Sequence, residues 1–104
     1  MRWYVYIAYF FAGAFLANAV PHFTNGVSGR PFPSPFSSPP GQGESGAVVN
    51  VLWGTFNLAV GYLLLARVGR FDVRRPLHVL LFAAGWLLMS IMLANAFGAL
   101  YGGA

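Results

Sequence analysis

Three long stretches of this 104-residue chain contain no charged side chain: Trp3 to Val20, Ala47 to Ala66, and Leu77 to about Tyr101. An ionised group near the centre of a bilayer costs at least about 2.5 kcal/mol, so uncharged stretches of this length are typical of a chain surrounded by lipid. As helices rising about 1.5 Å per residue, all three can cross a hydrocarbon core of about 30 Å. The sequence therefore predicts an all-α integral membrane protein with three transmembrane helices.

The composition also indicates an integral membrane protein. Only 8% of the residues are charged and 58% are hydrophobic, whereas a typical soluble domain is roughly 25% charged. The length allows a single domain. The chain has no cysteine, which excludes disulfides, thiolate metal sites, iron–sulfur clusters and c-type haem attachment.

The ends of the predicted helices carry local signals. Pro21 is expected to end the first helix, Gly46 precedes the second, and Pro76 suits the first turn of the third. The predicted order is helix 1 at about 3–20, an outer loop at 21–46, helix 2 at about 47–66, a basic inner loop at 67–76, and helix 3 at about 77–101.

The distribution of arginine predicts the orientation, because short cytoplasmic loops hold an excess of Lys and Arg. The second connection contains Arg67, Arg70, Arg74 and Arg75. This connection and the N-terminus are therefore expected on the inner side, and the Pro-rich first connection and the C-terminus on the outer side. Asp72 is expected to offset its arginine neighbours.

The net charge of +4 has a simple explanation in this setting. Juxtamembrane arginines gain about 1 kcal/mol each near an acidic leaflet, so the bilayer and its anionic lipids at the inner face are the expected partners of the basic loop. A nucleic-acid partner is not expected. The other expected partner is the protein itself or another membrane protein.

The first stretch has a second interpretation. Ala17-Asn18-Ala19 has the small-x-small spacing that signal peptidase recognises, so the stretch can also be a cleaved signal peptide. A usual apolar signal region is about 7 to 15 residues long. The greater length of this stretch favours a retained helix.

The loop at 21–46 is long for a connection between packed helices. Its second half, rich in Gly, Ser and Pro, reads as a flexible linker, while its first half is apolar. Each residue before a proline is driven to extended geometry, so Arg30 to Phe36 is expected to form a polyproline II rod that presents phenylalanines. The expected role is a hydrophobic cap on the outer helix ends, with a partner-docking strand or a lid as alternatives. The candidate residues of the loop are His22, Phe23, Phe32 and Phe36.

Several of these residues belong to a pattern that runs from Asn18 to Asn57. It comprises Asn18-Ala19-Val20-Pro21-His22-Phe23, Gly26, Gly29, Phe32, Ser34-Pro35-Phe36, Val51-Leu52-Trp53-Gly54 and Asn57. The chain resembles, in this pattern, a family of small uncharacterised bacterial inner-membrane proteins with a Pro-His-Phe element and a Phe/Pro-rich outer loop. The resemblance implies a bacterial cytoplasmic membrane location, and it brings no known activity, ligand or catalytic residue.

Four asparagines lie at or within the predicted spans: Asn18, Asn50, Asn57 and Asn95. An amide in hydrocarbon needs hydrogen-bond partners, so such side chains usually face other helices. Because Leu16-Ala17-Asn18-Ala19 recurs as Leu93-Ala94-Asn95-Ala96, the sequence also suggests that Asn18 and Asn95 lie at a similar depth, where they can pair or contact Asn50.

The second span carries a small and polar stripe. Gly46, Asn50, Gly54, Asn57 and Gly61 recur at steps of three and four, which places them on one helix face. The expected role of this stripe is a packing seam fixed by interhelical hydrogen bonds. A water- or ion-lined path is the alternative.

Catalysis needs a nucleophile or an acid–base pair held together, and the sequence offers neither. His22 and His78 are expected at opposite membrane faces, the first capping a helix end and the second anchoring at the interface, so they cannot share haem or a metal. Glu44 is expected to be solvated. The sequence predicts no catalytic, cofactor-binding or metal site, and a non-enzymatic membrane protein that acts by helix packing as an accessory or structural subunit or homo-oligomer. The alternative is a small-solute or ion conduit in which an oligomer lines a path with the Asn/Gly face.

Overall fold

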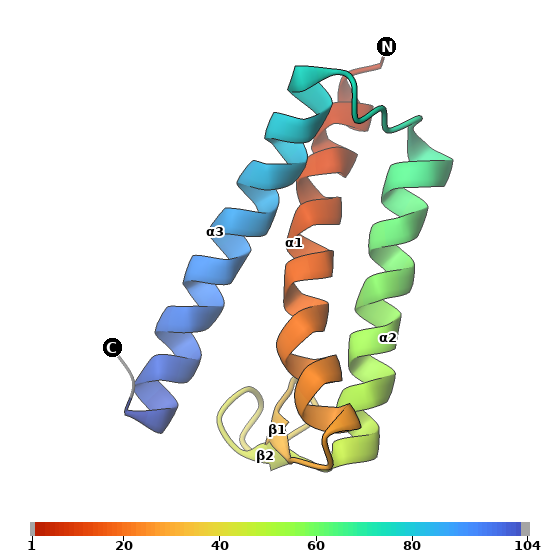
Figure 1. Ribbon diagram of the computed structural model, residues 1–104. Helices are drawn as coiled ribbons and strands as arrows, with labels where there is room; N and C mark the ends of the chain where they lie inside the picture. The colour runs from red at the N-terminus through yellow and green to blue at the C-terminus, as the bar shows by residue number, and fades with distance from the viewer. Residues whose placement is uncertain (1, 103–104) are drawn as a thin grey trace.

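The computed structural model describes residues 2–102 (Figure 1). Met1, Gly103 and Ala104 lie outside the described residues. The predictions of the membrane side on which these end residues lie therefore also fall outside the described part of the chain. The described elements are α1 (Trp3–Val27), β1 (Phe32–Pro33), β2 (Glu44–Ser45), α2 (Ala47–Leu63), the π-helical segment η1 (Leu64–Val68) and α3 (Pro76–Tyr101).

The helix α1 lies between α2 and α3 and packs along both, whereas α2 and α3 scarcely touch each other (Figure 1). Glycines allow the close approach of the helices. A Cβ atom on Gly85 of α3 would overlap the backbone carbonyl of Phe10, and one on Gly13 of α1 would overlap that of Phe82. Small residues at such points let helix backbones meet, as they do between membrane helices.

The helices agree with the coarse sequence prediction. Trp3–Val27, Ala47–Val68 and Pro76–Tyr101 are each long and apolar enough to cross a membrane. The molecule measures 42 Å along its long axis. A mainly helical fold with three candidate spans is thus confirmed.

The predicted end of the first helix is wrong. The helix α1 passes through Pro21 and ends at Val27, so His22 and Phe23 belong to α1 and not to the outer loop. Proline removes one backbone donor, but membrane helices tolerate this where neighbouring groups compensate. The missing donor would have bonded the Ala17 carbonyl. The Asn25 side chain adds a bond elsewhere, to the Pro21 carbonyl at 2.8 Å, in the turn that follows the proline. The extra turns also bury His22 and Gly26 against α2, so tertiary packing outweighs the local stop signal.

The connection between α1 and α2 spans residues 28–46 and folds back on the helices. The predicted polyproline II rod is absent from this described segment. Instead, β1 and β2 pair antiparallel, with Phe32 opposite Ser45 and Pro33 opposite Glu44. The chain reverses between the strands, where the backbone N–H of Gly41 donates to the Ser34 carbonyl at 2.8 Å. The prolines at 31, 33 and 35 keep the backbone extended locally, but hydrogen bonds bend the segment into a hairpin.

The second helix also runs further than predicted. After Leu63 it continues as η1 to Val68, so the inner connection occupies residues 69–75. Gly69 lies against Val5 and Tyr9 of α1, where a side chain would not fit. Pro76 occupies the first turn of α3, close to the predicted boundary. Gly102 ends α3 with a φ of 74°, which favours glycine.

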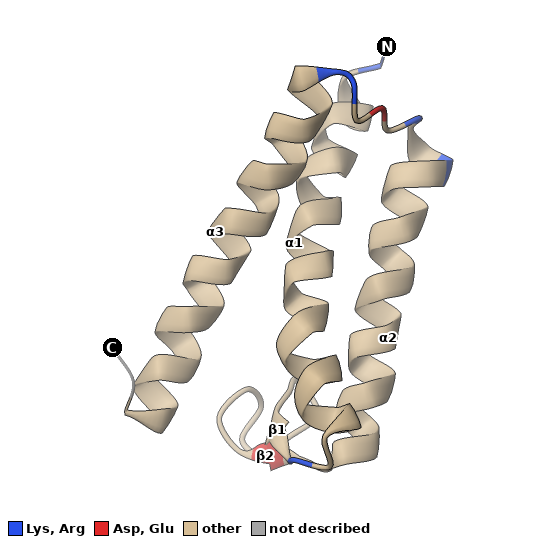
Figure 2. Ribbon diagram, viewed as in Figure 1, with Lys and Arg blue, Asp and Glu red and all other residues tan. Residues whose placement is uncertain are grey.

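Among residues 2–102, charged side chains lie only at the two ends of the molecule (Figure 2). One end carries Arg2, Asp72 and the four arginines of residues 67–75, and the other carries Arg30 and Glu44. We call the first the inner end and the second the outer end. The helices between them are free of charged side chains.

Candidate functional site at the outer end of the helices

Four polar side chains gather at the outer half of the α1–α2 interface: Asn18, His22, Asn50 and Asn57. Asn18 of α1 donates its Nδ2 to Oδ1 of Asn57 on α2 at 3.1 Å. Asn57 in turn donates its own Nδ2 to the Trp53 carbonyl one turn earlier at 2.8 Å. Asn57 is 1% exposed, so these bonds satisfy an amide that has no access to water.

Further out along the same interface, Asn50 of α2 meets His22 of α1. The Oδ1 atom of Asn50 lies 2.9 Å from Nδ1 of His22, and both side chains are buried. The Nδ2 atom of Asn50 faces three backbone carbonyls, so its Oδ1 must be the atom that faces the imidazole. His22 Nδ1 is therefore the donor, and its Nε2 keeps a lone pair.

Asn50 also fastens the outer connection to the helices. Its Nδ2 donates to the carbonyls of Phe32 in β1, Ser45 in β2 and Gly46 at the start of α2, at 2.9, 3.2 and 3.1 Å. The hydroxyls of Ser34 and Ser45 share a further bond of 2.6 Å across the hairpin. One fully buried amide thus joins α1, α2 and both strands, which explains why a Gly- and Pro-rich segment adopts a single fold here.

A hollow of about 380 Å³ lies beside this cluster, between α1, α3 and the outer connection. His22, Asn18 and Ser34 contribute polar groups to its lining, and Phe97 of α3 and Trp53 of α2 contribute aromatic ones. The Trp53 indole N–H is buried and has no hydrogen-bond partner among residues 2–102. The lining contains no charged side chain, so the hollow suits water or a small uncharged molecule.

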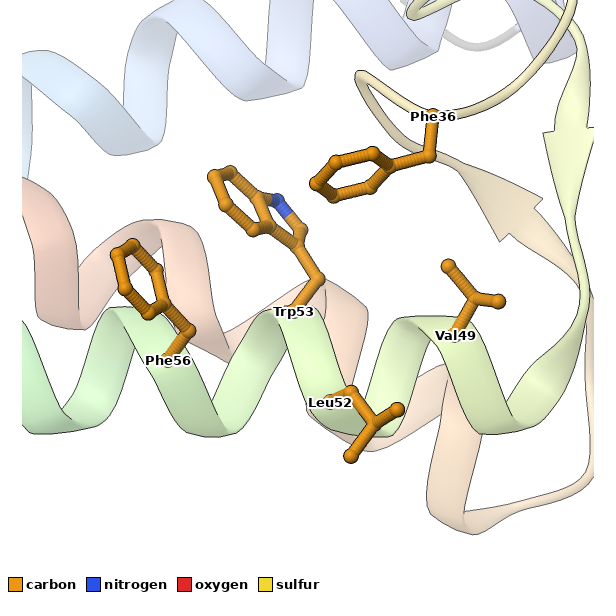
Figure 3. Close-up of a pocket in the computed structure, with 5 residues that line it drawn as sticks. All are labelled: Phe36, Val49, Leu52, Trp53 and Phe56. Atoms are coloured by element: carbon orange, nitrogen blue, oxygen red, sulfur yellow. The ribbon is translucent and has the colours of Figure 1, made fainter.

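Trp53 also lines a larger hollow, of about 520 Å³ (Figure 3). The indole stacks on Phe56, with centroids 5.6 Å apart, and meets Phe36 edge-on at 5.3 Å. Val49 and Leu52 complete an almost wholly apolar lining. Phe36 is 66% exposed, so this hollow opens on the surface and its chemistry suits an acyl chain.

The predicted stripe on the second span lies against α1. Asn50, Gly54, Asn57 and Gly61 are the buried residues of α2. A Cβ atom on Gly54 would meet the Phe23 backbone at 2.7 Å, and one on Gly61 would meet the Leu16 side chain at the same distance. The small residues of the stripe thus let α1 approach, and the amides bond across the interface.

Asn95 does not join the cluster. It is exposed on α3, whereas Leu93 and Phe97, two positions before and after it, are partly covered and line the hollows beside α1. Because neighbouring positions on a helix are separated by about 100°, this places Asn95 on the opposite face. The suggested pairing of Asn18 with Asn95 is wrong, because Asn18 pairs with Asn57 instead.

The inner end holds a second buried histidine. His78 is 2% exposed and packs on Tyr9 of α1, with ring centroids 4.6 Å apart, and on Phe71 of the inner connection at 6.0 Å. Its Nδ1 accepts the Asp72 backbone N–H at 3.1 Å. The expectation of an interfacial anchor is therefore wrong, because the inner connection folds over the ring.

Asp72 does not pair with an arginine side chain in this structure. Its carboxylate accepts the Arg74 backbone N–H at 2.9 Å, forming a local turn. Within residues 2–102, no carboxylate lies within salt-bridge distance of Arg67, Arg70, Arg74 or Arg75. At the outer end, Glu44 is exposed and accepts a hydrogen bond from the Tyr101 hydroxyl at 2.6 Å.

The described residues form no metal centre, since no three His, Cys, Asp or Glu side chains gather among them. His22 and His78 lie at opposite ends of the helices, and each is engaged by its own neighbour. The sequence interpretation missed the Ser34–Ser45 bond and Gly85. Neither has a local signal, because serine is common in loops and glycine in apolar helices.

Comparison of the chain with protein-family models, with curated proteins and with solved structures finds no match. The resemblance to small bacterial inner-membrane proteins therefore stays a prediction.

Proposed function

We propose that this chain is a non-enzymatic integral protein of the bacterial cytoplasmic membrane that acts by helix packing and self-associates through the outward face of α3. The observation that carries the proposal is the exposed position of Asn95 within a candidate span. The partner that best satisfies the Asn95 amide is a second copy of this protein.

Membrane insertion is supported by the distribution of charge and by size. Three long apolar helices separate the charged ends, and the 42 Å length matches a bilayer of about 40 to 45 Å with its headgroups. The arginines favour an inner position for residues 69–75 and, with it, an N-terminus inside and a C-terminus outside.

Self-association follows from the chemistry of an amide. In hydrocarbon an exposed amide lacks water, so burial against another helix lowers its free energy. An Asn side chain is both donor and acceptor and can therefore bond to its own copy. Two copies related by a two-fold axis normal to the membrane place Asn95 at the same depth, so the amides can meet. Ala99 lies one turn further along the same face and permits close approach.

The alternative of a conduit receives no support from the stripe on α2. Asn50 and Asn57 are 0% and 1% exposed, and both are bonded within the chain. A path lined by them would require α1 to leave α2. The polar groups of the stripe therefore favour packing within the protomer.

The test uses single cysteines, for which the cysteine-free chain is suited. Met92 lies on the Asn95 face of α3 and is 62% exposed, and Leu52 of α2 is exposed to a similar extent, at 65%. Under mild oxidation in native membranes, Met92→Cys should give a disulfide-linked dimer and Leu52→Cys should not. Adding Asn95→Leu to Met92→Cys should lower the dimer yield severalfold.

Equal cross-linking from both positions would mean random collision and would contradict a defined interface. An absence of dimer from Met92→Cys, with the cysteine fully reactive toward a maleimide, would also overturn self-association through this face.

A further inference from the structure

A groove of about 500 Å³ runs along the inner half of the α1–α2 pair. Its apolar wall comprises Leu16, Leu58, Leu65, Ala66 and Phe71. Leu58 and Ala66 are eight residues apart, so the groove follows α2 and η1 for about 12 Å. It is separate from the outer cluster and has no role in the association proposed for α3.

The inner end of the groove is basic. Arg70 contributes to the lining, and Tyr62 adds a hydroxyl. Arg70 has no carboxylate within salt-bridge distance among the described residues, and neither has Arg67 or Arg74 nearby in the sequence. A guanidinium binds two phosphate oxygens at once through its fork of N–H donors. An unpaired arginine beside an apolar groove is therefore complementary to a phosphate group attached to an acyl chain.

We infer that this groove is a binding site for one anionic phospholipid of the inner leaflet, with an acyl chain along the Leu16–Leu65 wall and the headgroup phosphate on Arg70. Basic pockets between membrane helices on the cytoplasmic side recognise such headgroups. Anionic lipid fits better than zwitterionic lipid because five arginines and one aspartate lie at this end. The inference rests on membrane insertion, as the proposed function does, but not on self-association.

The experiment measures lipid retained by the full-length protein in native mass spectrometry from mild detergent. The probes are phosphatidylglycerol and phosphatidylcholine with identical acyl chains. One phosphatidylglycerol per protomer should be retained in preference to phosphatidylcholine. Arg70→Gln should weaken phosphatidylglycerol binding about fivefold, whereas Arg74→Gln, an equal change of charge outside the groove, should weaken it less than twofold.

A second pair of variants tests the acyl-chain wall. Ala66→Phe fills the groove, and Ala59→Phe adds the same bulk at an exposed position of α2 outside it. Only Ala66→Phe should reduce lipid retention, and circular dichroism should show equal helix content in both variants.

If Arg70→Gln and Arg74→Gln weaken phosphatidylglycerol binding equally, the lipid is attracted to the arginine cluster in general, and the proposed site is overturned. Equal retention of the two lipids, or unchanged retention in Ala66→Phe, would overturn it as well. Extraction of the protein from membranes by alkaline carbonate would instead refute insertion. A protein that resists extraction and cross-links through α3 but retains no phosphatidylglycerol would refute the lipid site alone.

Discussion

The two ends of the molecule both bury a histidine under a connecting segment, but they hold that segment in different ways. At the outer end, His22 bonds to the Asn50 side chain, which reaches three carbonyls of the hairpin and of the α2 start. At the inner end, His78 accepts one backbone N–H, from Asp72, and the rest of the contact is aromatic packing by Tyr9 and Phe71. The outer connection is thus held by directional bonds, and the inner one mainly by ring contacts.

The difference extends to charge. The outer connection has Arg30 and Glu44 near its two strands, and both have side-chain partners within the chain, Asn25 and Tyr101. The inner connection leaves its guanidinium groups without carboxylate partners among residues 2–102. A segment bonded internally is specified by the protein alone, whereas unpaired arginines favour a partner outside it, such as lipid phosphate. The variants below test this contrast.

The largest expected effect concerns orientation. Replacing Arg70, Arg74 and Arg75 with Gln removes most of the inner charge, so a reporter fused after Ala104 should change from one side to roughly equal populations on both. Protease protection and enzymatic reporters measure this distribution. Arg30→Gln, at the outer end, should leave the orientation unchanged. An unaltered reporter in the triple variant would show that the inner charges do not set topology.

The largest expected loss of stability lies at Asn50. Asn50→Leu removes its four hydrogen bonds and leaves the His22 donor and the hairpin carbonyls unpaired, so the free energy of unfolding should fall by about 3 kcal/mol. Titration with a denaturing detergent, followed by circular dichroism, measures the change. Proteolysis between residues 28 and 46 should accelerate.

Asn95→Leu is the matched control for this substitution. Asn95 is exposed, and its side chain forms no hydrogen bond with the residues that the structure describes, so the unfolding free energy of the monomer should change by no more than about 0.5 kcal/mol. Similar losses in the two variants would contradict the special role given to Asn50.

Sequence patterns predicted the three candidate spans because the absence of charge over a whole helix is a strong, local signal. The face of α2 that meets α1 could also be predicted from the sequence. Asn50, Gly54, Asn57 and Gly61 recur with the helical period, and glycines mark where helix backbones approach each other. Both features depend on spacing within one helix, which a single sequence displays directly.

Other features depend on contacts between distant segments. Pro21 is a sound stop signal taken alone, but burial of His22 and Gly26 against α2 carries α1 through it. Likewise, Asn18 and Asn95 share a four-residue context and still face different surroundings. Because α1 is central and α3 is flanked on one side only, the same local sequence is more buried in α1 than in α3.

A smaller effect is expected at His22. In His22→Phe, Oδ1 of Asn50 loses its donor in a buried site, and the unfolding free energy should fall by about 2 kcal/mol. Detergent titration gives the value. His22→Gln retains a side-chain donor and should recover part of the loss. If Gln is no better than Phe, the hydrogen bond to Asn50 is not what stabilises this end.

A still smaller effect than that of His22→Phe is expected at the other histidine. His78→Phe keeps an aromatic ring against Tyr9 and Phe71 and removes only the acceptor of the Asp72 N–H. The free energy of unfolding should therefore fall by about 1 kcal/mol. Asp72 lies in the charged connection, where water can replace the acceptor if the connection shifts. The same titration, run beside His22→Phe, compares the two ends with one chemical change. A loss as large as that of His22→Phe would mean that a directional hydrogen bond fixes the inner connection too, and the distinction between the two ends would not hold.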